Sequence, residues 1–273
     1  MKNGANLKGS FRVLTETPDF RILGRSEDAV ASDAAREELL SEEGGLLAID
    51  KPYGETSFFV VNRIRGAISR ATGIRRIKCG HAGTLDPLAT GLLLLATRRS
   101  TKKIPMLMGL GKTYRVRMRF GVTSPSFDLE RPIEICDAPR DLNDAELRHA
   151  ILALQGEHNQ EPPAFSAIKQ KGKPVYRRAR AGEEVTLQPR AILVHEVEIL
   201  STQWPEAAFR VCVSKGTYIR SIVRDLAASL GTGGILTDLV RESIGPYKNE
   251  DALTLTDAIR LLAPSETPVA THP

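Results

Sequence analysis

Cysteines and long apolar runs are scarce in this sequence, and each shortage excludes a class of protein. The three cysteines among 273 residues have no CxxC spacing and no paired histidines, so neither a disulfide framework nor a zinc site is predicted. The longest apolar run, residues 92–96, is far shorter than the roughly 18 residues of a membrane span, and the first residues lack a signal-peptide core. We therefore expect a protein of the reducing cytoplasm that uses no metal and no membrane.

Acidic side chains are nearly absent from one long stretch. Residues 56–127 contain 14 lysines and arginines and a single acid, Asp86. The first 43 residues, by contrast, contain 6 basic and 9 acidic side chains, although the whole chain carries a net charge of +5. A positive charge concentrated in this way suits a nucleic-acid partner.

The spacing of apolar residues predicts an ordered domain from about residue 45. Because strands and helices mix without a regular βαβ rhythm, the expected fold class is α+β with a mixed sheet. Residues 161–182 have no clean period and are predicted to form a long loop or an excursion. Strands are expected at 46–49, 112–120, 191–200 and 208–214, and helices from Thr56 or Ser57 to near Gly73 and at about 144–154, 219–230 and 256–262.

The first 43 residues lack any sustained period. Their content of Ser, Asp, Glu and Ala is typical of a mobile extension. A short amphipathic helix over residues 33–40 that docks on a surface is the alternative.

The segment Gly80–Gly91, GHAGTLDPLATG, is the densest local signal. Its glycines permit close backbone approach to a ligand, and Pro87 biases Asp86 toward an extended conformation. A single carboxylate among many cations should stay ionised at neutral pH, and an ionised, fixed carboxylate suits a nucleophile. The alternative is that Asp86 caps a turn or pairs with an arginine. His81 in the same loop can either contact a substrate or be structural.

Two further segments suit RNA binding. In residues 214–220, SKGTYIR, a strand ends in a glycine turn and a helix begins at Tyr218 and Arg220, which suits anions. A capped helix start with two surface side chains is equally compatible with this pattern. Residues 169–180 contain six basic residues with Tyr176 and no acid, which suits an RNA backbone, although a charge run is commonly a solvated face.

Strict alternation over residues 112–120 predicts a strand with one apolar face and one basic face, the latter formed by Arg115, Arg117 and Arg119. A basic sheet face, basic loops and one isolated carboxylate together indicate a nucleic-acid enzyme. No P-loop, GxGxxG, HExxH or paired-carboxylate motif points to another chemistry.

Five segments, in order along the chain, resemble motifs of the TruB-type tRNA pseudouridine synthases. The resemblance covers about residues 45–262. It implies the pseudouridine synthase fold, in which a mainly antiparallel mixed sheet is flanked by helices and loops around a central basic RNA-binding cleft. The matching segments are the Lys-Pro motif in 46–57, the loop 80–91, the KxY motif 112–114, the PPAFSAIK segment 162–169 and the SKGTYIR segment 214–220.

The same resemblance implies a domain plan. Residues 44–263 would form the catalytic domain, with an RNA-gripping insertion at about 157–185. Residues 264–273 would be a tail too short for the C-terminal PUA domain that many members have.

The resemblance also implies the reaction, which is conversion of uridine 55 in the T-loop of tRNA to pseudouridine without a cofactor. Asp86 would be the catalytic aspartate, which attacks the nucleoside so that the N1 glycosidic bond breaks before the uracil rejoins through C5. Tyr114 would stack on the flipped base and help to remove the C5 proton, and Arg220 would pair with Asp86. The expected partner is the T-arm of tRNA, bound by a monomer.

The substrate-binding residues follow from the same resemblance. Tyr218 and Leu239 would line the pocket, whose aromatic and apolar side chains offset part of the cost of unstacking the base. His81 would help to hold the flipped-out nucleotides. Lys51, Lys169 and Arg241 would complete the binding set.

The chain departs from the family at three places. Ile235 and Val240 stand where the GGHL and LRR motifs have a histidine and an arginine, and residues 123–128 replace TDTxD, so altered RNA contacts are expected there.

A non-catalytic RNA-binding or tRNA-folding protein is a second hypothesis, against which the set of Asp86, Tyr114 and Arg220 argues. A synthase that acts on another RNA, or that depends on a guide RNA, is a third.

Overall fold

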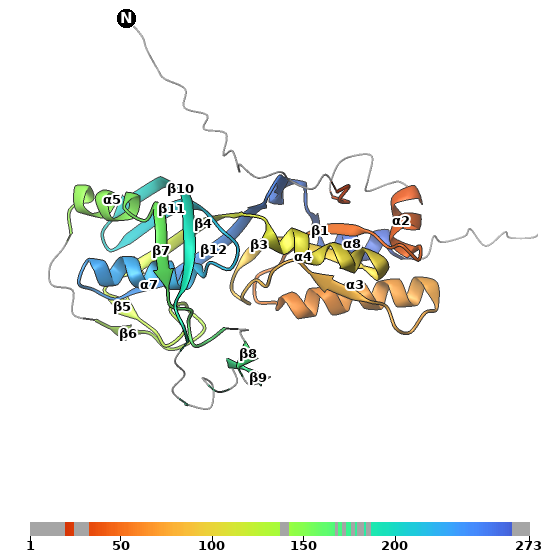
Figure 1. Ribbon diagram of the computed structural model, residues 1–273, viewed down its shortest axis with the longest axis horizontal. Helices are drawn as coiled ribbons and strands as arrows, with labels where there is room; N and C mark the ends of the chain where they lie inside the picture. Colours follow the sequence, from red (N-terminus) through yellow and green to blue (C-terminus); the bar gives the residue numbers. More distant parts are fainter. Residues whose placement is uncertain are drawn as a thin grey trace, which may run out of the picture.

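The computed structural model describes residues 20–24, 33–136, 142–166, 169–170, 173–175, 178, 183 and 187–263. A ten-stranded mixed sheet runs through the whole domain in the order β14-β1-β3-β12-β4-β11-β10-β7, with β2 beside β3 and β13 beside β12 (Figure 1). Two small hairpins, β5-β6 and β8-β9, lie outside it. The predicted α+β class with a mainly antiparallel sheet is therefore confirmed.

The strands are β1 Leu46–Lys51, β2 Cys79–His81, β3 Thr90–Thr97, β4 Lys112–Phe120, β5 Val122–Thr123, β6 Glu134–Ile135, β7 Gly156–Gln160, β8 Lys169–Gln170, β9 Lys173–Pro174, β10 Arg190–Gln203, β11 Glu206–Val213, β12 Gly234–Ile244, β13 Tyr247–Lys248 and β14 Leu253–Thr254. The α-helices are α2 Asp33–Leu40, α3 Ser57–Thr72, α4 Ile104–Gly109, α5 Asp144–Leu152, α7 Ile219–Ser229 and α8 Leu255–Leu261, and the 3₁₀ helices are η1 Arg98–Lys103 and η2 Asn249–Asp251.

The sheet has two halves, each covered by its own helices (Figure 1). In one half, α5 and α7 pack with β4, β10 and β11 around one apolar core. In the other half, α3 and α8 pack with β1 and β3 around a second core. The halves meet where β3 and β12 run parallel, with Thr90 opposite Val240 and Gly91 opposite Arg241. The segment that bears Asp86 enters β3 at this junction.

Helix α3 shows how local sequence sets the bounds of an element. The Thr56 hydroxyl accepts a hydrogen bond from the Phe59 amide at 3.0 Å and caps the first turn. Gly73 ends the helix in the left-handed conformation at φ 72°, where a side chain would be strained. The predicted helix is confirmed, and so are those in 144–154 and 219–230 and at the C-terminal end, together with all four predicted strands.

The expected boundary at residue 43 lies too late in the chain. Leu23 forms a parallel bridge with Leu47 of β1, and Ala35 and Leu39 of α2 are fully buried. The helix over residues 33–40 that was the alternative is therefore present, because its two apolar residues at i and i+4 pack into the core around α3. Residues 1–19 and 25–32 lie outside the described part.

Six of the ten strands of the sheet were not predicted from the sequence, namely β2, β3, β7, β12, β13 and β14. Strand β7 pairs with β10 at the sheet edge, so residues 157–160, which we expected to belong to the insertion, are part of the main sheet. Strand β12 lies between β3 and β4 near the sheet centre. Its Thr, Asp, Arg and Glu residues break the apolar alternation, and its pairing with β4 shifts register twice.

Candidate active site

Asp86 lies on the loop between β2 and β3, and its neighbours fix that loop through the backbone. The Ser57 hydroxyl accepts a hydrogen bond from the Leu85 amide at 2.8 Å and contacts the Leu85 carbonyl oxygen, to which it can donate, at 3.0 Å. Pro87 accepts a hydrogen bond from the Gly54 amide at 2.9 Å. The residues on both sides of Asp86 are therefore tied to the N-terminal end of α3 and to the turn before it.

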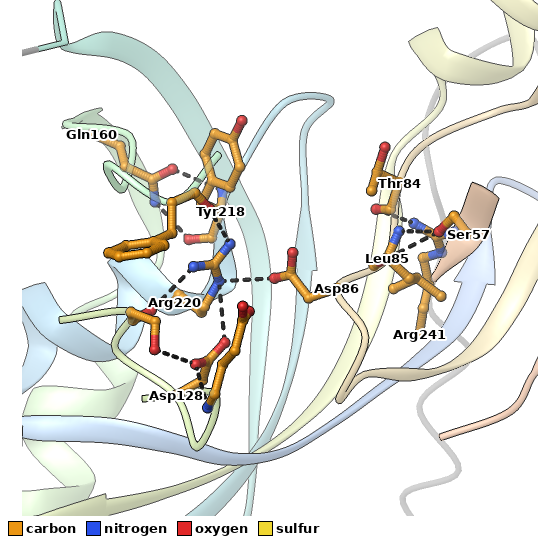
Figure 2. A network of polar contacts seen from close by, with 12 residues as sticks. Ser57, Thr84, Leu85, Asp86, Asp128, Gln160, Tyr218, Arg220 and Arg241 are labelled. Atoms are coloured by element: carbon orange, nitrogen blue, oxygen red, sulfur yellow. Dashed lines mark hydrogen bonds and ion pairs between the residues drawn. The ribbon is translucent and has the colours of Figure 1, made fainter. Parts of the chain in front are cut away.

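Two buried cations complete the support of this loop. Lys51 is 0% exposed, and its ammonium donates to the carbonyls of Pro52, Glu55 and Pro87 at 2.8, 2.6 and 3.1 Å. Arg241 is 1% exposed and donates to the carbonyls of Leu92 and Gly83 at 2.6 and 3.0 Å. It also donates to the Thr84 carbonyl at 3.5 Å (Figure 2).

These contacts argue against the prediction that Lys51 binds RNA. An ammonium has three N–H donors, and all three point to carbonyls inside the protein. Burial lowers the pKa of Lys51 to about 8, against the opposing effect of Asp86 and Glu55. Lys51 therefore supports the loop, while Arg241 both supports it and borders the cavity beside Asp86.

Arg220 comes from the first turn of α7, on the other side of the junction, and forms an ion pair with Asp86. Its Nε atom donates to Asp86 Oδ2 at 2.8 Å, and its two remaining nitrogens donate to the carbonyls of Ser126 at 3.1 Å and Phe165 at 2.8 Å (Figure 2). Arg220 is only 3% exposed. The ion pair that the resemblance implied is present, and each of the three guanidinium nitrogens donates a hydrogen bond.

Asp128 is a second carboxylate beside Arg220, and the sequence reasoning missed it. Its Oδ2 lies 3.7 Å from Arg220 Nε, while its Oδ1 accepts hydrogen bonds from the Ser126 hydroxyl at 2.5 Å and the Glu130 amide at 2.9 Å. It is 4% exposed. The only sequence signal was its place at the end of the segment that departs from the family motif.

The charge environment of Asp86 differs from the expectation. Burial raises its pKa above the ordinary value, Arg220 acts in the opposite direction, and the carboxylate of Asp128 raises it further. The sequence shows the cations near Asp86 but not the acid that folding brings to the same arginine. Arg220 is therefore the main group that favours the ionised form.

Asp86 separates two cavities that both border its side chain. The first, of about 310 Å³, is lined by Asp86, Tyr114, Tyr218, Arg220, Leu239 and Arg241, among others. The second, of about 410 Å³, contains His81 together with Phe58 and Phe165. Both have the size of small-molecule sites. Folding thus brings together all the predicted pocket residues except Lys51, which is buried, and Lys169, whose side chain lies outside the described part.

Tyr114 projects from β4 into the first cavity and is 7% exposed. The opposite face of β4 is only in part the free basic surface that the alternation suggested, because Arg117 and Arg119 are exposed but Arg115 is paired. Arg115 lies 3.8 Å from Asp238 and 3.7 Å from Glu242, and Glu242 also pairs with Arg210 of β11 at 2.6 Å. Neighbouring strands thus supply acids that offset part of the charge on this face.

Comparison with known proteins identifies the family. A family model for the N-terminal domain of TruB family pseudouridylate synthases matches residues 70–219. The chain belongs to this family. A TruB relative from Phocaeicola vulgatus, named tRNA pseudouridine synthase B, is 42% identical over 214 residues, which cover 78% of this chain and 91% of the relative. The protein of the same name from Chlorobaculum tepidum is 44% identical over 229 residues, covering 83% and 94%.

Solved structures extend the comparison to the fold. A crystal structure of a Cbf5-Nop10-Gar1 complex matches this chain with a TM-score of 0.61 and 27% identity, and the match covers 90% of this chain. This chain spans about 60% of that protein's length.

Within the residues that the structure describes, no helix could cross a membrane, and no cluster of three or more His, Cys, Asp or Glu side chains could hold a metal ion.

Proposed function

We propose that this chain converts uridine 55 in the T-loop of tRNA to pseudouridine. The observation that carries the proposal is the ion pair between Asp86 and Arg220 at the edge of a cavity that also contains Tyr114. The relatives that match most of this chain are named tRNA pseudouridine synthase B, which supports the formation of pseudouridine in tRNA. The cavity has the size of a site for one flipped nucleoside.

The proposed roles follow the geometry. Asp86 attacks C1′, and the bond between C1′ and the carboxylate forms as the C1′–N1 bond breaks. The uracil then rotates, and C5 bonds to C1′ as the bond between C1′ and Asp86 breaks. N1 gains a proton and C5 loses one, so the reaction is an isomerisation that consumes no co-substrate. Tyr114 packs against the uracil and assists removal of the C5 proton, and Arg220 keeps Asp86 ionised and oriented.

The substrate enters the site with its base out of the stack. Tyr218 and Leu239 line the cavity that receives the uracil, while His81 and Phe58 border the second cavity, which suits a neighbouring nucleotide. Lys169 lies in the segment proposed to grip the RNA. We propose that a monomer binds the T-arm in the cytoplasm, and light scattering of the protein with and without the RNA measures that state.

Pseudouridine mapping on a T-arm stem-loop transcript tests the proposal. Wild-type protein should modify the T-loop uridine, and Asp86→Asn should leave it unmodified while binding the RNA at least as tightly, because a negative charge facing phosphate is removed. Asp251→Asn, which changes an exposed carboxylate in η2, is the control and should stay active. Binding without modification by the wild type would instead indicate another RNA target or a binding-only function.

A further inference from the structure

Gln160 forms a pair of hydrogen bonds with the backbone of Tyr218. Its side-chain Nε2 donates to the Tyr218 carbonyl at 3.0 Å, and its Oε1 accepts from the Tyr218 amide at 2.8 Å (Figure 2). Gln160 is the last residue of β7 and is 2% exposed. One buried side chain thus satisfies both polar backbone groups of a residue that lines the cavity.

This contact lies where α7 begins. Tyr218 is the residue before the first turn of α7, and its own side chain makes no capping hydrogen bond. The first amides of a helix have no partner within the helix, so their positions depend on groups outside it. Gln160 supplies such a group, and Arg220 follows two residues later on the same turn.

The chain after Gln160 stays against this turn. The Glu161 carbonyl accepts hydrogen bonds from the Ser221 hydroxyl at 2.8 Å and from Arg224 at 3.1 Å, and the Phe165 carbonyl accepts one from Arg220 at 2.8 Å. On the side of this segment the contacts use backbone carbonyls, which substitution of Glu161 or Phe165 leaves in place. Gln160 contributes side-chain atoms to the contact and can therefore be tested by mutation.

We propose that Gln160 is a positioning residue for pseudouridine formation, which acts by fixing the start of α7 so that Tyr218 and Arg220 meet the substrate and Asp86 in register. This inference rests on the proposed function. Without the paired bonds, the Tyr218 amide loses its partner and the Tyr218 carbonyl keeps only the Ile222 amide, which donates to it at 3.1 Å. The start of α7 then shifts toward other partners. A displacement of about 1 Å at reacting groups costs about 100-fold in rate.

The first test is the single-turnover rate of Gln160→Leu on the T-arm transcript, which is expected to fall about 100-fold while the dissociation constant for RNA changes by less than about 3-fold. The matched control is Asn143→Ala, which removes the side-chain cap of α5, a helix that lines neither cavity beside Asp86. That variant should lose stability but keep the wild-type rate. An equal rate loss in both variants would show a merely structural role and overturn the proposal.

The second test uses Gln160→Glu. A protonated carboxyl group can both donate to the Tyr218 carbonyl and accept from its amide, as the glutamine does, whereas the ionised form only accepts. The rate of this variant relative to wild type should therefore rise as the pH is lowered. A ratio that does not change with pH would contradict the proposal.

Hydrogen exchange keeps the proposal testable without turnover. In Gln160→Leu, amides in residues 218–222 should exchange faster than in wild type, while those of α5 stay unchanged. Unchanged exchange at the start of α7 would overturn the inference whatever the activity. An inactive wild type would instead refute the proposed function, so the two failures are distinguishable.

Discussion

The two sides of the Asp86–Arg220 ion pair are built in opposite ways. On the side of Asp86, the loop presents carbonyl groups, and the buried cations Lys51 and Arg241 donate to them. On the other side, Arg220 is itself the cation and donates to the carbonyls of two connecting segments, at Ser126 and Phe165. The loop that bears Asp86 is thus held by buried donors, whereas Arg220 depends on acceptors in connecting segments.

The difference indicates which side can adjust. Moving the Asp86 loop would leave buried charges without partners, which is costly in a dry interior. The acceptors of Arg220 lie between elements of the sheet and not within it. We therefore expect Asp86 to be a rigid reference point and the start of α7 to be the part whose position sets the rate.

The largest effect is expected for Arg220→Lys. A lysine can reach Asp86 but lacks the planar fork that also contacts Ser126 and Phe165, so the single-turnover rate should fall about 1,000-fold. RNA affinity should change little. Arg224→Lys, the same change one turn later on α7, is the control and should retain most of the rate. A similar rate in the two variants would contradict the inference that the start of α7, and not the Asp86 loop, sets the rate.

Asp128→Asn should lower the rate about 100-fold, because it weakens the placement of Arg220. It should also move the acid limb of the pH–rate profile. Burial and Asp128 raise the pKa of Asp86, and the reaction needs the ionised form, so the wild-type rate falls as pH drops through that raised pKa. Removing the Asp128 charge lowers the pKa and should shift the limb to lower pH; a shift to higher pH would contradict this assignment.

Ser57→Ala tests the rigid side. Losing both bonds to Leu85 should cost about 1–3 kcal/mol of unfolding free energy and lower the rate about 10-fold, since the two buried cations still fix the loop. The control is Ser100→Ala, in which a buried serine of η1 loses its hydrogen bond to the Gly44 carbonyl. This variant should lose stability and keep the wild-type rate. Chemical denaturation and single-turnover assays separate the two effects, and a loss above that of Asp128→Asn would reverse the proposed order.

Local patterns predicted those parts of the site that are contiguous in sequence. The glycines and proline around Asp86 predict a shaped loop, and the glycine turn at 216 predicts the helix that carries Arg220. The ion pair between them spans 134 residues of sequence, and only the family resemblance supplied it. Periodicity alone cannot pair residues so far apart.

What the sequence could not predict depends on polar residues whose partners are backbone groups. Gln160 ends a strand whose alternation carries His and Asn, so nothing marks it as buried. From the sequence alone Lys51 is expected to be an exposed cation, and only the fold shows the three carbonyls to which it donates. Such groups are recognised only when their neighbours are known, because a buried charge is tolerated through its hydrogen bonds and not through its type.

The smallest expected effect concerns the buried lysines and is a stability effect. Burial lowers the pKa of Lys51 and of Lys112 to about 8 in the folded protein, from an ordinary 10.5. Above about pH 8 the unfolded chain therefore binds more protons than the folded one, and the unfolding free energy should rise with pH, by up to about 1.4 kcal/mol per pH unit for each lysine. Urea unfolding from about pH 7.5 to 9 measures the slope.

The pH range of this measurement ends at about 9, because above that pH a buried thiol makes the unfolding free energy fall as the pH rises. Burial raises the pKa of Cys79 to about 12, so above its ordinary value of 9 the folded state binds the extra proton and stability falls with pH. Below pH 9 the two lysines should determine how the unfolding free energy changes with pH. Lys112→Met should therefore remove about half of its rise. If the unfolding free energy of the wild type does not change with pH, the two ammonium groups are hydrated in the folded protein. That result would contradict the inference that the Asp86 loop is the more rigid side of the ion pair.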